Sequence, residues 1–321
     1  MHHDLEEPYQ HSGRTRGMTR LHPDEVAIDE TLVRRLLSTQ LPELAGLPLE
    51  PVRSQGTDNI VYRLGPELSV RLPRKLSAVP SLLIERDWLP RLAPSVPLAV
   101  PVPVASGEPD ELYPFPWAVC IWVPGTRLGF EELGRNGARA LAEFVAALHS
   151  CDASQGPQVA AGQRGGPVAA YDQTARTALR SVLDLQTAGR IEPDLVDGDL
   201  AAEIWSAAVA APAWQEPGVW THRDLHGGNL LTTGARLTGV IDFGGLIVGD
   251  PAADVMGAFH VLSAADRRLF CDLVGVDDAT LTRARGLALC QGLEALPYYL
   301  DTHPGMVAFA HRAIAATLGQ Q

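Results

Sequence analysis

The stretch that decides the fold is Thr221-His-Arg-Asp-Leu-His-Gly-Gly-Asn-Leu-Leu231, followed by Val240-Ile-Asp-Phe-Gly244. The first segment contains the pattern H-R-D-x-x-x-x-N, and the second contains D-F-G. Between the two patterns lie two short apolar runs, Asn229–Thr232 and Leu237–Ile241, which a glycine turn joins. Runs of this length around such a turn predict a β-hairpin.

The hairpin folds the chain back, so we expect Asn229 and Asp242 to meet at its open end. Their amide and carboxylate oxygens are ligands that suit Mg²⁺. Phosphoryl transfer from ATP needs a metal at the phosphates and a group that accepts the proton of the attacking hydroxyl. The two patterns in this order are typical of kinase-fold phosphotransferases. We therefore predict Asp224 as the catalytic base, with Asn229 and Asp242 as metal ligands.

Two other interpretations of these segments exist. In the first, Asp224 and His222 satisfy hydrogen bonds within a loop, and D-F-G is a simple turn. In the second, His222 and His226 bind zinc at i, i+4 spacing. The zinc interpretation lacks the glutamate of H-E-x-x-H, and Gly227-Gly228 argues against a continuing helix.

Composition limits the function further. The chain has 321 residues, of which 46% are hydrophobic and 20% charged, and its net charge is −12. The acidic balance argues against a nucleic-acid partner, and no apolar run is long enough to span a membrane. Lys75 is the only lysine, so no Walker A loop can be written. The four cysteines are scattered, which favours reduced thiols, and we expect a cytoplasmic monomer or homodimer without a membrane partner.

The chain divides into a leader and two lobes. Residues 1–17 are polar and aperiodic and predict a flexible leader. Residues 18–124 are expected to form a strand-rich, nucleotide-binding lobe, and residues 125–321 a larger helical lobe with the catalytic and acceptor sites. Expected helices cover 26–40, 81–92, 130–150, 172–188, 194–211, 251–263, 265–274, 278–296 and 304–318; expected strands cover 49–54, 60–64, 68–72, 100–104 and 117–123.

The loop Ser54-Gln-Gly-Thr-Asp-Asn59 lies between two of the expected strands. Its small polar residues Ser54, Gly56, Thr57 and Asn59 could bend over nucleotide phosphates and donate backbone N–H and hydroxyl groups to them. An ordinary hairpin turn explains the same segment equally well.

Arg71 stands at the inward-facing position of the next strand, where protein kinases carry a phosphate-binding lysine. A guanidinium can supply that charge and adds a bidentate fork. Lys75 is the competitor, but it follows Pro73 beyond the end of the strand. Glu85 on the following helix is the candidate partner of Arg71, and the alternative for it is a solvated helix carboxylate.

The segment Trp117–Gly125 is an apolar strand that ends in Pro124-Gly125. The backbone of Ile121, Trp122 and Val123 is placed to form an interlobe hinge that binds adenine, although a core strand and loop would look the same. Further along, Asp250 and Pro251 predict a helix start, and Asp254 is a candidate brace for the catalytic loop.

Taken together, S-x-G-T-D-N, V-R-L-P-R, P-W-A-V-x-x-W-x-x-G, H-R-D-L-H-x-G-N and D-F-G…G-D-P-x-x-D resemble the aminoglycoside phosphotransferase family. The resemblance implies an α+β, bilobal protein-kinase-like fold with a small antiparallel-sheet N-lobe and a larger, mostly helical C-lobe. It also implies Mg²⁺, ATP or GTP as co-substrate, and transfer of the γ-phosphoryl group to a small-molecule hydroxyl. Arg223 stands where these enzymes often have a small residue, so crowding beside the base is expected. No A-P-E segment follows D-F-G, which argues against a protein kinase.

The acceptor is expected in the helical lobe. Glu294, Tyr298 and Asp301 could bind ammonium groups and stack on the rings of an aminosugar; the alternative is a helix with core aromatics and exposed acids. The resemblance implies a small-molecule antibiotic as acceptor, aminoglycoside-like or a macrolide or nucleoside antibiotic, whose modification confers resistance. A housekeeping kinase of choline-like or thiosugar-like metabolites is the alternative. A nucleotide-binding pseudokinase is disfavoured because the three key residues are intact.

Overall fold

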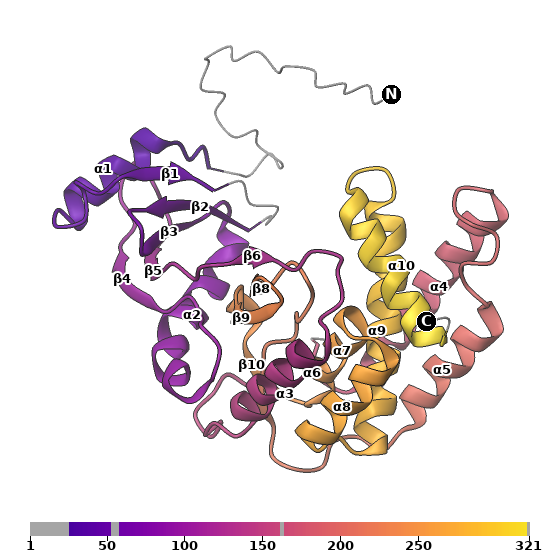
Figure 1. Ribbon diagram of the computed structural model, residues 1–321. Helices are drawn as coiled ribbons and strands as arrows, with labels where there is room; N and C mark the ends of the chain where they lie inside the picture. The colour runs from indigo at the N-terminus through magenta and orange to yellow at the C-terminus, as the bar shows by residue number, and fades with distance from the viewer. Residues whose placement is uncertain (1–25, 53–57, 161–163, 320–321) are drawn as a thin grey trace, which may run out of the picture. The chain divides into compact units, whose positions relative to one another are not determined.

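The computed structural model describes residues 26–52, 58–160 and 164–319 (Figure 1). These residues form two compact units. The first combines the described chain up to Val79 with Ala105–Val119, and the second combines Pro80–Val104 with the chain from Cys120 onward. The predicted leader, residues 1–17, lies outside the described residues. The segment 80–104 thus belongs with the helical unit, although its place in the sequence is among the strands of the first.

The first unit is built on a five-stranded sheet in the order β1-β2-β3-β5-β4. The strands are β1 (Leu49–Pro51), β2 (Asn59–Leu64), β3 (Leu68–Pro73), β4 (Pro103–Gly107) and β5 (Trp117–Ile121). β2 pairs antiparallel with both β1 and β3. Alternate residues of β2 are buried, which is the pattern of a strand with one face on a core.

Helix α1 (Glu30–Gln40) supplies the other side of that core through Val33, Leu36 and Leu37. Its first turn is fixed by Asp29, whose carboxylate accepts a hydrogen bond from the backbone N–H of Leu32 at 2.8 Å. This cap explains why the helix begins four residues later than the periodicity predicts.

The second unit is mostly helical. Its long helices are α2 (Val79–Leu92), α3 (Arg135–His149), α4 (Asp172–Thr187), α5 (Gly198–Ala210), α8 (Ala264–Val274), α9 (Asp278–Tyr299) and α10 (Pro304–Leu318). α9 packs against α4, α5, α6 and α10, and twelve of its residues are buried. α9 is therefore the central helix of this unit, as its place in Figure 1 shows.

Two short sheets in the second unit carry the segments that the sequence singled out. β7 (Val219–Thr221) pairs antiparallel with β10 (Ile247–Gly249), and β8 (Leu230–Thr233) pairs antiparallel with β9 (Arg236–Val240). β6 (Thr126–Arg127) adds to the edge of β8. The predicted hairpin is confirmed. β6, β7 and β10 have only two or three residues each, which is too short for a periodicity to show.

The helix expected over 251–263 is divided into α6 (Ala252–Val255) and α7 (Gly257–Val261). At the break, a Cβ built on Gly257 would lie 2.6 Å from the Cβ of Leu225. The missing side chain lets the segment that carries H-R-D pack directly on this helix. The helix expected from 194 begins only at Gly198, because the Asp197 side chain caps it.

A buried ion pair joins the start of α6 to α9. Arg283 Nε and Nη2 donate to the two carboxylate oxygens of Asp250 at 2.7 and 3.1 Å, and both side chains are nearly inaccessible to solvent. The same carboxylate accepts the N–H of Ala252, which is the predicted cap.

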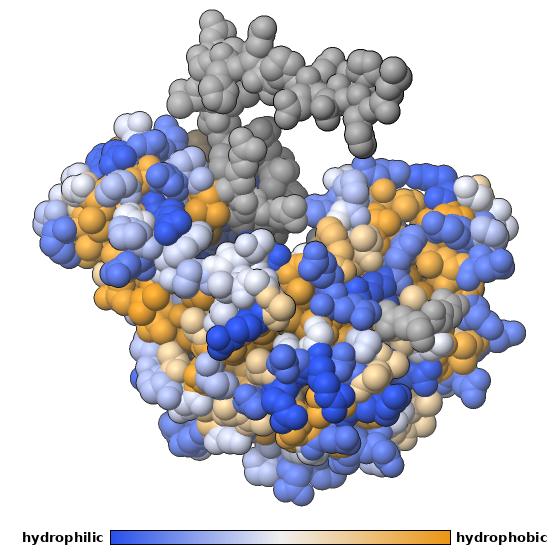
Figure 2. Space-filling model, viewed as in Figure 1, coloured by the Kyte–Doolittle hydropathy of each residue, from blue (hydrophilic) through white to orange (hydrophobic). Residues whose placement is uncertain are grey.

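Exposed large apolar residues are scattered through the described chain, and in Figure 2 the outer edge of the helical unit is covered mostly by hydrophilic residues. None of the described helices combines the length and apolar character that a bilayer-spanning segment needs.

We expect Arg283→Leu to lower the free energy of unfolding by about 3–5 kcal/mol, because it leaves the Asp250 carboxylate buried without its partner. Urea denaturation at neutral pH measures the change. The control is Arg190→Leu, which breaks the exposed pair with Asp301 and should cost at most about 1 kcal/mol. Equal effects of the two substitutions would contradict the role assigned to the buried pair.

Candidate active site

The segment that follows β7 is held by one buried carboxylate. Asp254 of α6 is fully buried, and its two oxygens accept the backbone N–H groups of Arg223 at 2.7 Å and His222 at 3.1 Å. His149 Nε2 lies 3.1 Å from the same carboxylate. Asp254 therefore fixes the backbone just before Asp224, as the sequence suggested.

Backbone strain is concentrated in the same place. Arg223 and Asp242 both have φ of 68°, and they are the only non-glycine residues with positive φ in the described part of the chain. Such conformations cost free energy and persist only where neighbouring contacts enforce them. Arg223 lies in the H-R-D-x-x-x-x-N pattern, and Asp242 is the first residue of the D-F-G pattern.

Asp224 and Asn229 contact each other directly. Asn229 Nδ2 donates to the backbone carbonyl and to Oδ2 of Asp224, both at 2.9 Å. These two acceptors assign the orientation of the amide, because only the nitrogen can donate. Oδ1 of Asn229 is thereby the oxygen available to a cation.

Both histidines of the segment are engaged through Nδ1. His222 Nδ1 accepts the N–H of Asp224, while its Nε2 faces the carbonyl of Ile241 at 3.1 Å. His226 Nδ1 accepts the N–H of Gly228 at 3.0 Å, which leaves Nε2 to face Asp224 Oδ2 at 3.4 Å. These hydrogen bonds position the loop, so the arrangement gives no support to a zinc site on His222 and His226.

Asn229 and Asp242 come to the same end of the hairpin. The N–H of Ile241 donates to the carbonyl of Asn229 at 2.9 Å, which continues the β8–β9 register outward to the residue before Asp242. Asp242 is exposed and has no cationic partner among the described residues. An amide oxygen and a free carboxylate fit Mg²⁺, which is commonly held by one or two carboxylates and the substrate phosphates. No cluster of three His, Cys, Asp or Glu suited to a metal occurs in the described chain.

The charge of Asp224 is stabilised by its neighbours. Burial raises the pKa of this carboxyl, but the hydrogen bond from His226 and the charge of the Arg164 guanidinium hold it well below its usual range. Arg164 Nη1 lies 3.5 Å from Asp224 Oδ1, and more than a third of each side chain is exposed. Asp224 is therefore ionised, as a proton acceptor must be.

The Arg223 side chain does not crowd the base, contrary to the expectation. Its guanidinium donates to the carbonyls of Arg164, at 2.9 Å, and Gly245. It therefore connects the loop before α4 to the turn that follows Asp242. The loop is also held by the N–H of Asp250, which donates to the carbonyl of Gly165 at 2.8 Å.

An aromatic wall lies on the other side of His226. The Phe309 ring of α10 contacts the rings of His226 and His260, with centroid distances of 5.6 and 4.8 Å. His260 is buried, and burial lowers its pKa to about 3. This wall is uncharged at neutral pH.

The predicted nucleotide-binding residues are distributed over both units. Ser54, Gly56 and Thr57 lie outside the described residues, and Asn59 begins β2 half-buried. Arg71 is buried in β3 of the first unit, opposite Val61. Glu85 is buried on α2, with 2% of its surface exposed, so the alternative of a solvated carboxylate is wrong.

The predicted hinge residues are the last residue of β5, Ile121, and the two residues that follow it. The N–H of Ile121 donates to the carbonyl of Val102 at 2.8 Å and is therefore not free to bind a base. Trp122 is half-buried and Val123 is buried. Adenine binding by this segment stays a prediction.

The three predicted acceptor residues do not form one cluster of free carboxylates. Glu294 is exposed on α9 and accepts from the Cys290 thiol at 3.7 Å, and Tyr298 is 72% exposed with its ring against Tyr299. Asp301 is paired with Arg190 at 2.7 Å.

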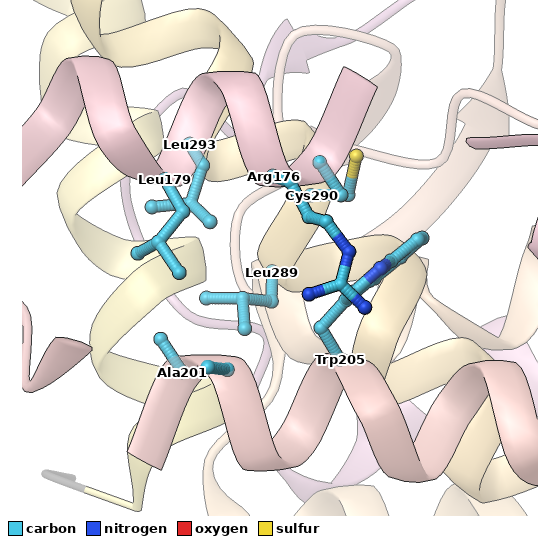
Figure 3. Close-up of a pocket in the computed structure, with 9 residues that line it drawn as sticks. Arg176, Leu179, Ala201, Trp205, Leu289, Cys290 and Leu293 are labelled. Atoms are coloured by element: carbon cyan, nitrogen blue, oxygen red, sulfur yellow. The ribbon is translucent and has the colours of Figure 1, made fainter. Parts of the chain in front are cut away.

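A small pocket lies between α4, α5 and α9 (Figure 3). Arg176 and Leu179 of α4 face Ala201 and Trp205 of α5 across it, and Leu289 of α9 forms part of the wall. None of the residues predicted for the site lines this pocket.

Sequence reasoning missed two contacts of the site. Arg164 lies in a glycine-rich loop before α4, and His149 is the last residue of α3. A lone arginine in such a loop carries no spacing that points to Asp224, so only the folded chain reveals the contact.

We expect Asp254→Ala to destabilise the protein by about 3 kcal/mol, because two buried N–H groups lose their acceptor. Chemical denaturation measures it, with Asp272→Ala on the exposed face of α8 as the matched control, which should change stability by less than about 0.5 kcal/mol. A loss below about 1 kcal/mol for Asp254→Ala would contradict the bracing role.

The lowered pKa of Asp224 predicts a pH dependence of stability. A carboxyl whose folded pKa lies below its unfolded value of about 3.9 contributes stability at neutral pH. That contribution is lost as the pH falls toward the folded pKa. The difference in melting temperature between wild type and Asp224→Asn should thus be constant from about pH 6 to 8 and shift against the wild type below about pH 4. A difference that stays constant down to pH 3 would contradict the assigned direction.

Comparison with known proteins places this geometry in a family. The model of the phosphotransferase enzyme family matches residues 50–289. No curated protein sequence matches the chain. Among solved structures, the GDP and kanamycin complex of APH(2")-IIia is similar, with 18% identity over 91% of this chain and 100% of that chain and a TM-score of 0.66.

Two further structures extend the comparison. The macrolide 2'-phosphotransferase MphH from Brachybacterium faecium has 22% identity, covers 89% of this chain and 96% of its own, and gives a TM-score of 0.59. The spectinomycin phosphotransferase APH(9)-Ia, bound to ADP and spectinomycin, has 13% identity, 92% and 99% coverage, and a TM-score of 0.60. These likenesses confirm the kinase-like α+β fold. The family match extends over most of the chain, including H-R-D-x-x-x-x-N and D-F-G, and the chain therefore belongs to the phosphotransferase enzyme family.

Proposed function

We propose that this phosphotransferase uses ATP or GTP with Mg²⁺ to transfer the γ-phosphoryl group to a hydroxyl of a small-molecule antibiotic, which would confer resistance. The observation that carries the proposal is the contact between Asn229 and Asp224, at the hairpin end where Asp242 also emerges. It supports the proposal because it brings together the residue that we propose as proton acceptor and the two that we propose as metal ligands.

In this mechanism Asp224 accepts the hydrogen bond of the acceptor hydroxyl and takes its proton as the oxygen attacks the γ-phosphorus. The bond from that phosphorus to the β–γ bridging oxygen breaks, and the nucleoside diphosphate leaves with the electron pair. Asn229 holds Asp224 Oδ2 through its amide nitrogen, which orients the carboxylate and leaves Asn229 Oδ1 for the metal. Asp242 supplies the second oxygen. Bound Mg²⁺ would offset the negative charge of the phosphates. Asp254 keeps the loop in its strained conformation throughout, because its hydrogen bonds are buried.

The nucleotide contacts are part of the same proposal. Arg71 is proposed to hold the phosphates with Glu85 as its partner, and Ser54, Gly56, Thr57 and Asn59 to cover them. The backbone around Trp122 and Val123 is proposed to receive the base. Relatives crystallised with GDP or ADP support a nucleotide co-substrate of this kind.

The choice of an antibiotic as acceptor is supported by the kanamycin, macrolide and spectinomycin enzymes among the similar structures. A housekeeping metabolite kinase is the second candidate. It is favoured by the pairing of Asp301 with Arg190, which leaves fewer free carboxylates for a polycationic drug than the sequence suggested.

We expect Asp224→Ala to lower phosphate transfer by about 10²–10⁴-fold, the usual contribution of a general base, while nucleotide affinity changes little. The assay incubates enzyme, ATP and Mg²⁺ with aminoglycosides, macrolides, nucleoside antibiotics and metabolites, and detects a product heavier by one phosphate. Calorimetry measures the nucleotide affinity.

The matched control is Asp184→Ala, an exposed carboxylate on α4, which should behave as wild type. Full transfer by Asp224→Ala would show that another group is the base. No transfer to any acceptor by the wild type would favour the pseudokinase.

A further inference from the structure

We propose that Arg164 is a specificity-determining residue, which makes the site accept hydroxyl compounds whose neighbouring group is neutral or anionic and disfavour those with an ammonium there. This inference rests on the proposed function, because it assumes that Asp224 faces the attacked hydroxyl. It concerns the charge of the acceptor, which the family match leaves open.

The first step is the position of the Arg164 guanidinium. Nη1 lies 3.5 Å from Asp224 Oδ1, and 39% of the Arg164 side chain is exposed. An acceptor hydroxyl that hydrogen-bonds to Asp224 places its neighbouring carbon, and any group on it, within a few ångströms of this cation. The bare carboxylate would attract an ammonium; Arg164 cancels that attraction at the point where it would matter most.

The second step is that Arg164 is held in place by its own backbone. Its carbonyl accepts from Arg223 Nη1 at 2.9 Å, and the next carbonyl, of Gly165, accepts the N–H of Asp250 at 2.8 Å. Gly165 has a φ of 93°, and a Cβ on Gly249 would lie 2.6 Å from its carbonyl oxygen. The guanidinium therefore extends from a backbone that the strained loop and the start of α6 both hold.

The third step concerns the other charges of the helical unit. An aminosugar with several ammonium groups needs several free carboxylates. Asp172 of α4 is bound by Arg176 and by the indole N–H of Trp205, all at 2.9 Å, and Asp301 is bound by Arg190. Among the three predicted acceptor residues, Glu294 alone is a carboxylate without an arginine partner.

An exposed ring near the loop that carries Asp224 points the same way. Phe309 and His260 are buried, whereas Phe130 is 57% exposed and follows Gly129, whose N–H donates to the carbonyl of Gly227. At the start of α10, the exposed Phe130 ring lies over Gly305, where an added Cβ would be 2.6 Å from Phe130 Cζ. Such surface suits the uncharged body of an acceptor and offers nothing to an ammonium group other than ring faces.

The test compares glucose with two related sugars. Glucosamine carries an ammonium in place of one hydroxyl, and glucuronate carries a carboxylate in place of the terminal hydroxymethyl group. Their affinities for the nucleotide-bound enzyme are measured by saturation-transfer NMR, without turnover. We expect the wild type to bind glucose and glucuronate at least about fivefold more tightly than glucosamine. Arg164→Gln should remove this preference by improving glucosamine binding, and Arg164→Lys should keep it.

The matched control is Arg236→Gln at the turn of the β8–β9 hairpin, opposite the end that carries Asn229. It removes the same charge and should preserve the wild-type order. Tightest binding of glucosamine by the wild type, an unchanged order in Arg164→Gln, or no binding of any probe would overturn the proposal. Because binding is read without phosphate transfer, the selectivity can fail while the enzyme still transfers phosphate, and the two failures are distinguishable.

Discussion

The site depends on one buried carboxylate that accepts two backbone N–H groups. Asp254 is fully buried, and its hydrogen bonds to His222 and Arg223 hold the chain where φ of Arg223 is positive. A buried N–H without an acceptor costs free energy, so the strained conformation is the favourable one while the Asp254 side chain accepts these hydrogen bonds. Asp224 is the next residue along the chain, so the same backbone sets the direction of its side chain.

Further hydrogen bonds position the polar side chains of this loop. The Asn229 amide fixes Asp224, the histidine rings accept backbone N–H groups, and Arg223 links the loop before α4 to the D-F-G turn. Each of these contacts lies within the helical unit. The arrangement of oxygen donors is therefore built into that unit by its own packing and involves none of the strands of the first unit.

Much of this was predictable from sequence because the patterns are local. H-R-D-x-x-x-x-N and D-F-G are separated by a hairpin, and the register of a hairpin follows from its turn, so the meeting of Asn229 and Asp242 could be anticipated. The long helices also agreed, with the main errors at their starts. Two begin four residues late, where Asp29 and Asp197 act as caps, and α3 begins at Arg135, five residues after the expected start and without a side-chain cap. The strands β6, β7 and β10 were missed because two or three residues carry no periodicity.

Contacts between residues that are far apart in the sequence could not be predicted from it. Arg164 reaches Asp224 from a glycine-rich loop, and Asp301 is neutralised by Arg190 more than a hundred residues away. Both findings change the charge that an acceptor meets, whereas composition gives only a diffuse acidic surplus. The Arg223 side chain was expected to crowd Asp224. Its guanidinium instead donates hydrogen bonds to the carbonyls of Arg164 and Gly245.

The central claim is that Asn229 and Asp242 hold a divalent cation beside Asp224. Electron paramagnetic resonance titration of Mn²⁺ with ATP, on wild type, Asp242→Ala and Asn229→Leu, tests it most directly. The account predicts that the wild type binds the Mn²⁺–ATP complex and that either substitution weakens binding by at least about tenfold, worth roughly 1.4 kcal/mol. Unchanged Mn²⁺–ATP binding in both variants would contradict the account.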